Sequence, residues 1–197
     1  MKTFDINKLV IRDETEKDYL ESEAMIRRAF WDLYKPKCDE HYLTHVLRDS
    51  SVYLPLLTRL AVYEDKIVGA IYYAISQVID GDKTYKVITF GPLAVEPAFQ
   101  RLGIGGKLLE ATLAKAKELG YEVVVILGEP HYYPKYGFKR GSEFGIVMPD
   151  GNTLDALMCY ELRPGALKNI HGQFDVGDVF MNIDQTAVEQ YDKIFQK

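Results

Sequence analysis

Residues 100–107 read Gln-Arg-Leu-Gly-Ile-Gly-Gly-Lys, and this stretch decides how the chain is organised. A run rich in β-branched and aromatic residues, 84–95, precedes it, and a stretch with a broad apolar stripe at helical spacing follows it. This order predicts a strand, a tight turn and a long helix. The first turn of a helix has backbone N–H groups without intrahelical partners, and glycines let a ligand approach them closely. The segment therefore predicts an anion site, although the glycines also suit a plain strand-to-helix turn.

The spacing of the glycines separates this segment from two common nucleotide motifs. A Walker A loop needs a glycine where Arg101 stands and a serine or threonine where Leu108 stands. The dinucleotide fingerprint G-x-G-x-x-G, counted from Gly103, also needs a glycine at Leu108. ATP or GTP hydrolysis and nicotinamide cofactors are therefore disfavoured.

The composition is that of an ordinary globular domain. The 197 residues are 47% apolar and 27% charged, enough to bury a sizeable core. The formal net charge of −5 has the wrong sign for coating a phosphate backbone, so nucleic-acid binding is disfavoured. Apolar runs fall far short of the roughly 20 residues that cross a bilayer, and no signal peptide is recognisable. We therefore expect no membrane association.

Cysteine and histidine positions bear on the compartment and on metal binding. Cys38 and Cys159 define neither a disulfide framework nor a metal-binding spacing, and they suit a reducing cytoplasm, where we expect the protein to act. His41 and His45 stand one helical turn apart, but no glutamate lies between them and no third ligand is evident. We expect them on a solvent-facing helix, with no metal.

Hydrophobic periodicity predicts a mixture of helices and strands. The expected helices span 16–33 and 39–48, a long helix follows the turn within 100–120, with its apolar stripe from Ile104 and Gly120 as a cap, and a last helix begins after Asp184. The expected strands span 8–12, two runs within 56–79 joined at 64–66, 84–95, 121–127, 144–148 and 156–163. Gly91 and Pro92 are expected to break the run 84–95, so its pairing with a neighbouring strand should fail there.

Three elements in this order resemble the GNAT superfamily of acetyl-CoA-dependent N-acetyltransferases. They are the strand ending in Leu-Ala-Val at 93–95, the Gln-Arg-x-Gly-x-Gly loop, and Tyr-Pro-Lys-Tyr-Gly-Phe at 133–138. Residues 8–163 follow the family's order of elements, and the variants at 127–133 and 162–167 look most like its bacterial YhbS-like branch. The resemblance implies an α/β (α+β) fold, with a mixed twisted sheet, helices on both faces and splayed central strands. It implies one acetyltransferase domain over 1–163, with a C-terminal extension over 164–197 that packs on the same domain and ends in a helix.

The resemblance also implies how acetyl-CoA would be held, with its diphosphate on the loop and its pantetheine arm along the strand. The implied cofactor-binding residues are Leu93, Ala94, Val95, Gln100, Arg101, Leu102, Gly103, Ile104, Gly105, Gly106 and Lys107. Many members carry an asparagine after the strand that ends here at Leu127. Residues 128–130 read Gly-Glu-Pro instead, so that contact is not carried over.

Tyr133 matches the family's tyrosine, and the resemblance implies that it is the general acid for the coenzyme A sulfur. The alternative is that its ring only packs under the loop. No general base is identified: Glu96, Glu129 and His131 are candidates, and water can also take the proton.

The acceptor is less well specified than the donor. By resemblance the helix at 39–48 borders the acceptor site, where Asp39, Glu40 or Tyr42 could meet a substrate. The strand aromatics Tyr72, Tyr73 and Tyr85 could line the cleft or pack in the core.

We expect direct transfer of acetyl to a primary amine of a small molecule or peptide. One alternative is an acyl-CoA binding module without turnover, serving sensing or assembly. A second keeps the fold but uses a longer acyl donor or a protein amino group. The segment after residue 165 could cover the acceptor cleft, extend the sheet or form a homodimer contact.

Overall fold

The computed structural model describes residues 4–195, which fall into two compact units. The first unit contains residues 4–72, 91–112 and 179–195, and the second contains 73–90 and 113–178. Within the described residues there are five α-helices and a mixed sheet of nine strands. The expected mixed α/β fold class is confirmed.

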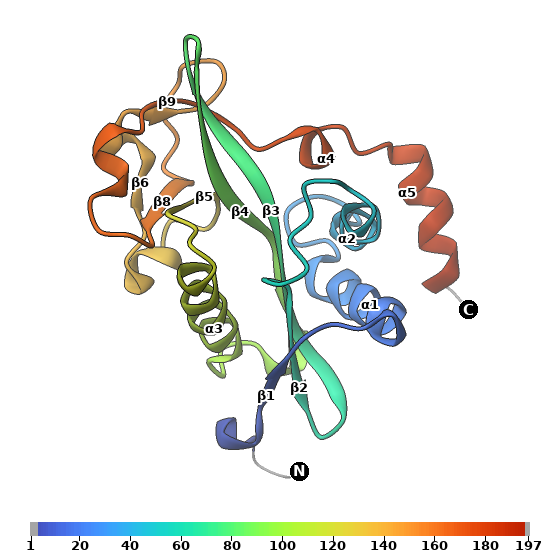
Figure 1. Cartoon of the computed structure of the whole chain (residues 1–197). Coiled ribbons are helices and arrows are strands. Elements are labelled where there is room, and N and C mark those ends of the chain that lie inside the picture. The colour runs from blue at the N-terminus through green and yellow to red at the C-terminus, as the bar shows by residue number, and fades with distance from the viewer. Residues whose placement is uncertain (1–3, 196–197) are drawn as a thin grey trace. The chain divides into compact units, whose positions relative to one another are not determined.

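Helices lie on both faces of a β-hairpin in the first unit (Figure 1). Strand β1 (Val10–Arg12) pairs antiparallel with β2 (Arg59–Tyr63), which pairs antiparallel with β3 (Lys66–Asp80). Helices α1 (Tyr19–Phe30) and α2 (Glu40–Arg48) lie on one side, and the start of α3 (Ile104–Glu118) lies on the other. The alternation of side chains along β3 produces this arrangement, because Tyr72 reaches Ser22 of α1 while Gly69 faces Ile104.

The ends of α1 are set by local polar contacts. Thr15 and Asp18 form a capping box before the helix, and both Asp18 oxygens accept hydrogen bonds from Arg12. The helix ends at Phe30, three residues earlier than expected, because Asp32 takes the left-handed conformation (φ +55°) and accepts from the Lys37 N–H at 2.7 Å. The helix therefore stops before Pro36 is reached.

Two further turns follow the sequence closely. Glu64 and Asp65 both have positive φ (+46° and +62°), as a two-residue hairpin turn requires. Helix α3 ends in a glycine cap: Gly120 has φ +82°, and its N–H donates to the Lys117 carbonyl at 3.1 Å. Leu119, which directly follows the last residue of α3, is 40% exposed although it is apolar.

Strand β4 (Lys83–Val95) runs without interruption, so the expected break at Gly91 and Pro92 is wrong. Proline lacks a donor, but its fixed φ is compatible with extended backbone, and the strand continues through it. In the second unit β4 pairs in parallel with β5 (Val123–Leu127) at Ile88 and Val124. This pair lies before Gly91, so the expected loss of pairing near Gly91 and Pro92 agrees with the register between β4 and β5. Leu93 and Val95 come five and seven residues after Ile88.

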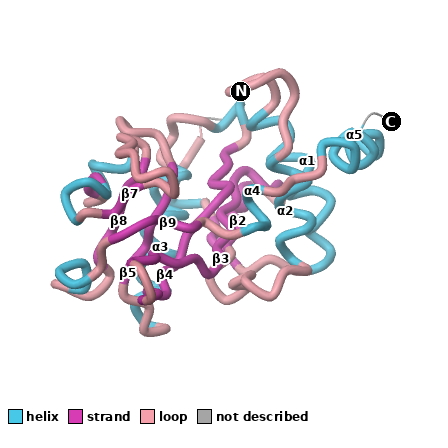
Figure 2. The backbone as a smooth tube through the Cα atoms, turned by 90° about the horizontal axis from the view of Figure 1, so that it is seen from above, coloured by secondary structure: helices cyan, strands magenta, loops and turns pink. Residues whose placement is uncertain are grey.

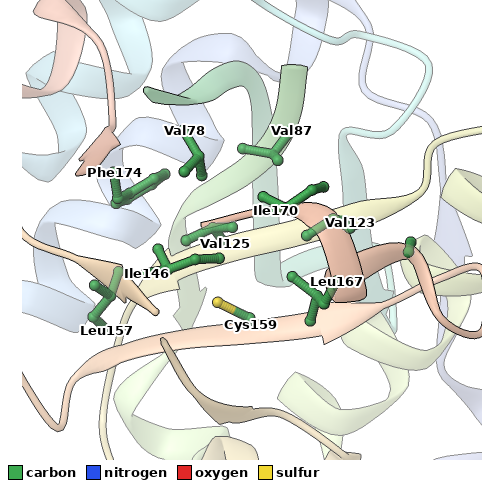
Figure 3. Packing of buried hydrophobic residues seen from close by; sticks show 11 residues of the cluster. Val78, Val87, Val123, Val125, Ile146, Leu157, Cys159, Leu167, Ile170 and Phe174 are labelled. Atoms are coloured by element: carbon green, nitrogen blue, oxygen red, sulfur yellow. The ribbon is translucent and has the colours of Figure 1, made fainter. Parts of the chain in front are cut away.

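The second unit is built around β5, which is buried along Val123–Ile126 as expected for a central strand. It pairs antiparallel with β8 (Leu157–Glu161), which pairs with β6 (Lys139–Arg140). Strand β9 (Gly172–Asp175) pairs with β3 and with β7 (Ile146–Val147), as Figure 2 shows. Figure 3 shows buried side chains from these strands pointing toward one another, with Cys159 facing the cluster.

The sequence did not indicate β9 or the short helix α4 (Asp178–Met181). The expected last helix is present as α5 (Gln185–Asp192), and Asp184 caps it by accepting from the Thr186 and Ala187 N–H groups. Residues 164–178 lie in the second unit and 179–195 in the first. Among the described residues, no helix has the length and apolar character that a bilayer crossing needs.

Candidate functional site

The glycine-containing segment forms a strand-to-helix connection in the first unit. After β4, the 3₁₀-helix Pro97–Phe99 leads into the loop, where Arg101 and Gly103 have positive φ (+62° and +89°). The Lys107 N–H donates to the Gly103 carbonyl at 3.1 Å, so Gly103 begins the first intrahelical hydrogen bond of α3. The loop thus turns the chain so that the helix begins immediately after it.

This geometry leaves donors for an anion. Lys107 is the first residue whose N–H donates within the helix, so the N–H groups of Ile104, Gly105 and Gly106 have no intrahelical partner. The helix dipole adds about half a positive charge at this end. Arg101 and Lys107 are exposed beside it, with Lys107 Nζ 3.5 Å from Glu110. The donor chemistry of the loop fits a diphosphate.

Burial alternates along the end of β4, as in a strand with one face covered. Ala94 is buried, whereas Leu93 and Val95 are half-buried. The Val95 carbonyl accepts a hydrogen bond from Gln100 Nε2 at 3.2 Å, which ties the start of the loop to the strand. All expected cofactor-binding residues, 93–95 and 100–107, therefore lie on one continuous segment of the first unit.

Tyr133 begins a 3₁₀-helix, Tyr133–Tyr136, in the second unit. Its ring lies among other aromatic rings: the ring centroids of Phe90, Phe138 and Tyr132 are 5.6, 5.5 and 5.0 Å away. Gly137, which follows the last residue of the 3₁₀-helix, has φ +93°. The ring of Tyr133 packs against these rings, as it would if packing were its role, and the residue is half-buried.

The three candidate bases have different surroundings. Glu96 is an ion-pair partner, because its Oε2 accepts from Nε and Nη2 of Arg28 at 2.9 and 2.7 Å. Glu129 and His131 are exposed in the loop after β5. These contacts single out none of the three as a base.

Helix α2 differs from the expectation of a solvent-facing helix, because His41 is fully buried and only His45 is partly exposed. Side chains of residues 191–195 cover His41: its ring centroid is 6.1 Å from that of Tyr191 and 5.5 Å from that of Phe195. Its Nδ1 is 3.5 Å from Cys38 Sγ.

The other ring nitrogen of His41, Nε2, is 3.6 Å from Asp192 Oδ1, and it has no hydrogen-bond partner within the described residues. Burial lowers the pKa of His41 to about 4, against the opposing effect of Asp192. No group of three or more His, Cys, Asp or Glu side chains in residues 4–195 is arranged to hold a metal ion.

The strand aromatics do not line a cleft. Tyr72 and Tyr73 are fully buried, and Tyr85 packs against the core cluster of the second unit. Asp39 bonds to Lys35 and to Gln185, and the ring of Tyr42 lies against those of His45 and Tyr191.

A buried ionic cluster in the first unit was missed by sequence reasoning. Arg48 is 5% exposed and contacts the carboxylates of Glu14 and Glu23, which are 4% and 1% exposed. Tyr72 donates to Glu14, and Tyr191 of α5 donates to Glu23. The one signal available was a glutamate within the apolar stripe of α1.

Comparison with known proteins gives a consistent result. The model of the acetyltransferase (GNAT) family matches residues 18–138. The uncharacterized N-acetyltransferase YhbS of Escherichia coli is 27% identical over 172 residues, which cover 87% of this chain and 98% of that protein. The uncharacterized N-acetyltransferase YjhQ of Escherichia coli is 34% identical over 94 residues, 48% of this chain and about half (51%) of that protein.

Two solved structures share the fold. The crystal structure of Escherichia coli YhbS in complex with CoA has a TM-score of 0.78 at 23% identity, covering 90% of this chain and 94% of that one. The structure of a GNAT family acetyltransferase from Brucella melitensis in complex with acetyl-CoA has a TM-score of 0.71 at 24% identity, covering 87% and 97%.

Proposed function

Because the chain belongs to the GNAT family of acetyltransferases, we propose that it uses acetyl-CoA to acetylate a primary amine of a small molecule or peptide. The resemblance to this family, and to its YhbS-like branch, is confirmed by the family match and by the YhbS relative. The observation that carries the proposal is the start of α3, where three N–H groups without intrahelical partners lie beside Arg101 and Lys107. A diphosphate is the anion that this donor set suits.

We assign the diphosphate to the loop 100–107 and the pantetheine arm to the backbone of Leu93–Val95. The half-buried positions of Leu93 and Val95 support this assignment, because extended backbone can bind an amide-containing arm through main-chain hydrogen bonds. The hydrogen bond from Gln100 to the Val95 carbonyl keeps strand and loop in a fixed relation.

When bound, acetyl-CoA supplies the acetyl group as a thioester. A C–N bond forms to the amine while the C–S bond breaks, so one proton must leave the amine and one must reach the sulfur. We assign a backbone N–H near Val95 to the negative charge that develops on the carbonyl oxygen, a role usually worth about 10²- to 10³-fold in rate. We assign the sulfur's proton to the Tyr133 hydroxyl, which then regains a proton from water. The amine's proton goes to water.

The remaining assignments belong to the same proposal. We take 1–163 as the acetyltransferase domain and 164–197 as an extension of it. The division of 164–178 and 179–195 between the two units supports this, because the extension forms no unit of its own. Cytoplasmic action is supported by the two cysteines, which are unpaired and buried. Size-exclusion chromatography with light scattering tests whether the protein forms a homodimer.

The donor and the turnover are tested separately. Calorimetric titration with CoA tests binding, and release of free thiol from acetyl-CoA with polyamines, amino acids, aminoglycosides and peptides tests transfer. Binding with no thiol release above background hydrolysis, across all these amines, would favour the acyl-CoA sensor.

Tyr133→Phe tests the general acid. We expect kcat to fall by about 10²- to 10⁴-fold and the alkaline limb of the pH profile to disappear. Tyr136→Phe is the matched control, because it removes a phenol from the same 3₁₀-helix, where its hydroxyl donates to Tyr132. Unchanged transfer and an unchanged alkaline limb in Tyr133→Phe would remove Tyr133 from the mechanism.

A further inference from the structure

Gly128, the first residue after β5, lies directly against the ring of Tyr133. A Cβ atom at position 128 would overlap Cε2 of Tyr133 and lie 2.9 Å from its Cδ2. It would also lie 3.3 Å from Cδ1 of Ile126. Carbon atoms in folded proteins pack at about 3.5–4.0 Å, so the ring and any side chain at this position cannot both keep their places.

The backbone of Gly128 gives no other reason for a glycine. Its φ lies outside the left-handed region, where nine other glycines of the described residues lie. Its N–H donates to the Ala156 carbonyl at 2.9 Å, which continues the pairing of the strand that precedes it. An alanine can adopt this conformation and keep this hydrogen bond. Glycine is therefore needed at this position for space, and the space is occupied by the ring of Tyr133.

The ring has little freedom to move away. Phe90, Phe138 and Tyr132 surround it at centroid distances of 5.6, 5.5 and 5.0 Å, with Tyr132 at an interplanar angle of 87°. Phe90 and Phe138 are themselves 6% and 2% exposed. Because dense packing resists small displacements, a methyl group at position 128 has to change the direction of the Tyr133 ring or move its neighbours.

We propose that Gly128 is a positioning residue for Tyr133: the missing side chain leaves the place in which the ring lies and so fixes where its hydroxyl points. The inference rests on the proposed role of Tyr133 as general acid. The two residues are five apart in sequence, and they meet because the loop after β5 returns as the 3₁₀-helix Tyr133–Tyr136.

An unfolding cycle tests the contact without any assay of activity. Four proteins are compared by urea unfolding: wild type, Gly128→Ala, Tyr133→Leu and the double variant. We expect Gly128→Ala to lower the midpoint in the wild-type background and to leave it unchanged, or raise it, once the ring is replaced by leucine. An equal loss in both backgrounds would overturn the inference, because the penalty would then not come from the ring.

A kinetic cycle tests the positioning. Acetyl-CoA is the donor, and the acceptor is the best amine among spermidine, L-lysine, tobramycin and a peptide with a free amino terminus. If none of these amines is acetylated, the slow hydrolysis of acetyl-CoA is measured instead. We expect Gly128→Ala to lower kcat by about 10- to 100-fold, since a displacement near 1 Å has such effects. The KM for acetyl-CoA should change less than about threefold, and a general loss of structure would not give this split.

The Tyr133→Phe background separates this inference from the proposed function. If Gly128 acts through the hydroxyl, Gly128→Ala causes no further loss of kcat once the hydroxyl is gone. A normal kcat for Gly128→Ala beside a low kcat for Tyr133→Phe would refute the positioning role and leave the general acid intact. A normal kcat for Tyr133→Phe would refute the general acid itself.

Discussion

The free energy of unfolding should decrease as the pH is lowered, because one buried imidazole, that of His41, resists protonation in the folded protein. Asp192 of α5 raises the pKa of His41, as does Asp39, whereas Arg27 of α1 lowers it. Burial is the largest effect and lowers this pKa from its ordinary value of 6.5 to about 4, and the side chain of His41 is 0% exposed. The folded protein therefore resists protonation in a range where the unfolded chain accepts it.

The sign and the magnitude follow from this difference. Between pH 6.5 and about 4 the unfolded state binds one proton more than the folded state, so the stability present above pH 6.5 is lost as the pH falls through this window. With about 1.4 kcal/mol for each unit of pKa, the full loss is about 3 kcal/mol, and about 2.5 kcal/mol of it is reached at pH 4.5.

The assay is urea unfolding of wild type and His41→Gln at several pH values from 4.5 to 7.5. The slopes of the free energy of unfolding against pH are compared, because the pH-independent loss of packing in the variant does not affect the slope. We expect the variant to lose about 2–3 kcal/mol less than wild type over this range. His131→Gln, which removes an exposed imidazole, is the control and should keep the wild-type slope. Parallel profiles for wild type and His41→Gln would refute the reasoning.

Two substitutions test the packing on either side of β3. Gly69→Ala places a Cβ 3.0 Å from Cγ2 of Ile104 and Cδ1 of Leu108, so we expect a loss of about 1–3 kcal/mol in urea unfolding and weaker CoA binding in calorimetry, because Ile104 begins α3. Unchanged CoA affinity would show that the start of the helix tolerates the shift. Arg48→Met leaves the carboxylates of Glu14 and Glu23 buried without their cation, and urea unfolding should show a loss of about 3–5 kcal/mol.

Much of the fold could be predicted because local patterns determined it. The polar tip at 64–66 gave the hairpin, and the glycines of 100–107 gave the strand-to-helix turn before α3. Gly120 gave the end of that helix, since only a residue tolerant of positive φ suits the position. The glycines of this segment also predicted an anion site, whereas the cofactor-binding residues were named from the resemblance to the GNAT family and stay a prediction.

Interactions between distant segments could not be predicted in this way. Leu43 and Leu47 of α2 are buried, as apolar residues usually are, but nothing in the sequence of this helix indicated that His41 is covered as well. Residues 191–195, some 150 positions later, cover it. Gly128 and Tyr133 are close in sequence, yet the direction of the ring also depends on Phe90, which comes from β4.

The contacts that hold α5 against the first two helices could not be predicted from the sequence, because they are mainly hydrogen bonds and ion pairs. Of the residues of this helix, only Val188 and Asp192 are buried, so little apolar area holds it to α1 and α2. Instead, Asp192 accepts from Nε and Nη2 of Arg27, and Tyr191 donates to the buried Glu23. Hydrophobic periodicity reads apolar faces only, and it classes Glu23 and Arg27 as interruptions of the α1 stripe. Buried charges on a helix are tolerated where partners from elsewhere in the chain satisfy them, so such interruptions mark the places where a distant segment binds.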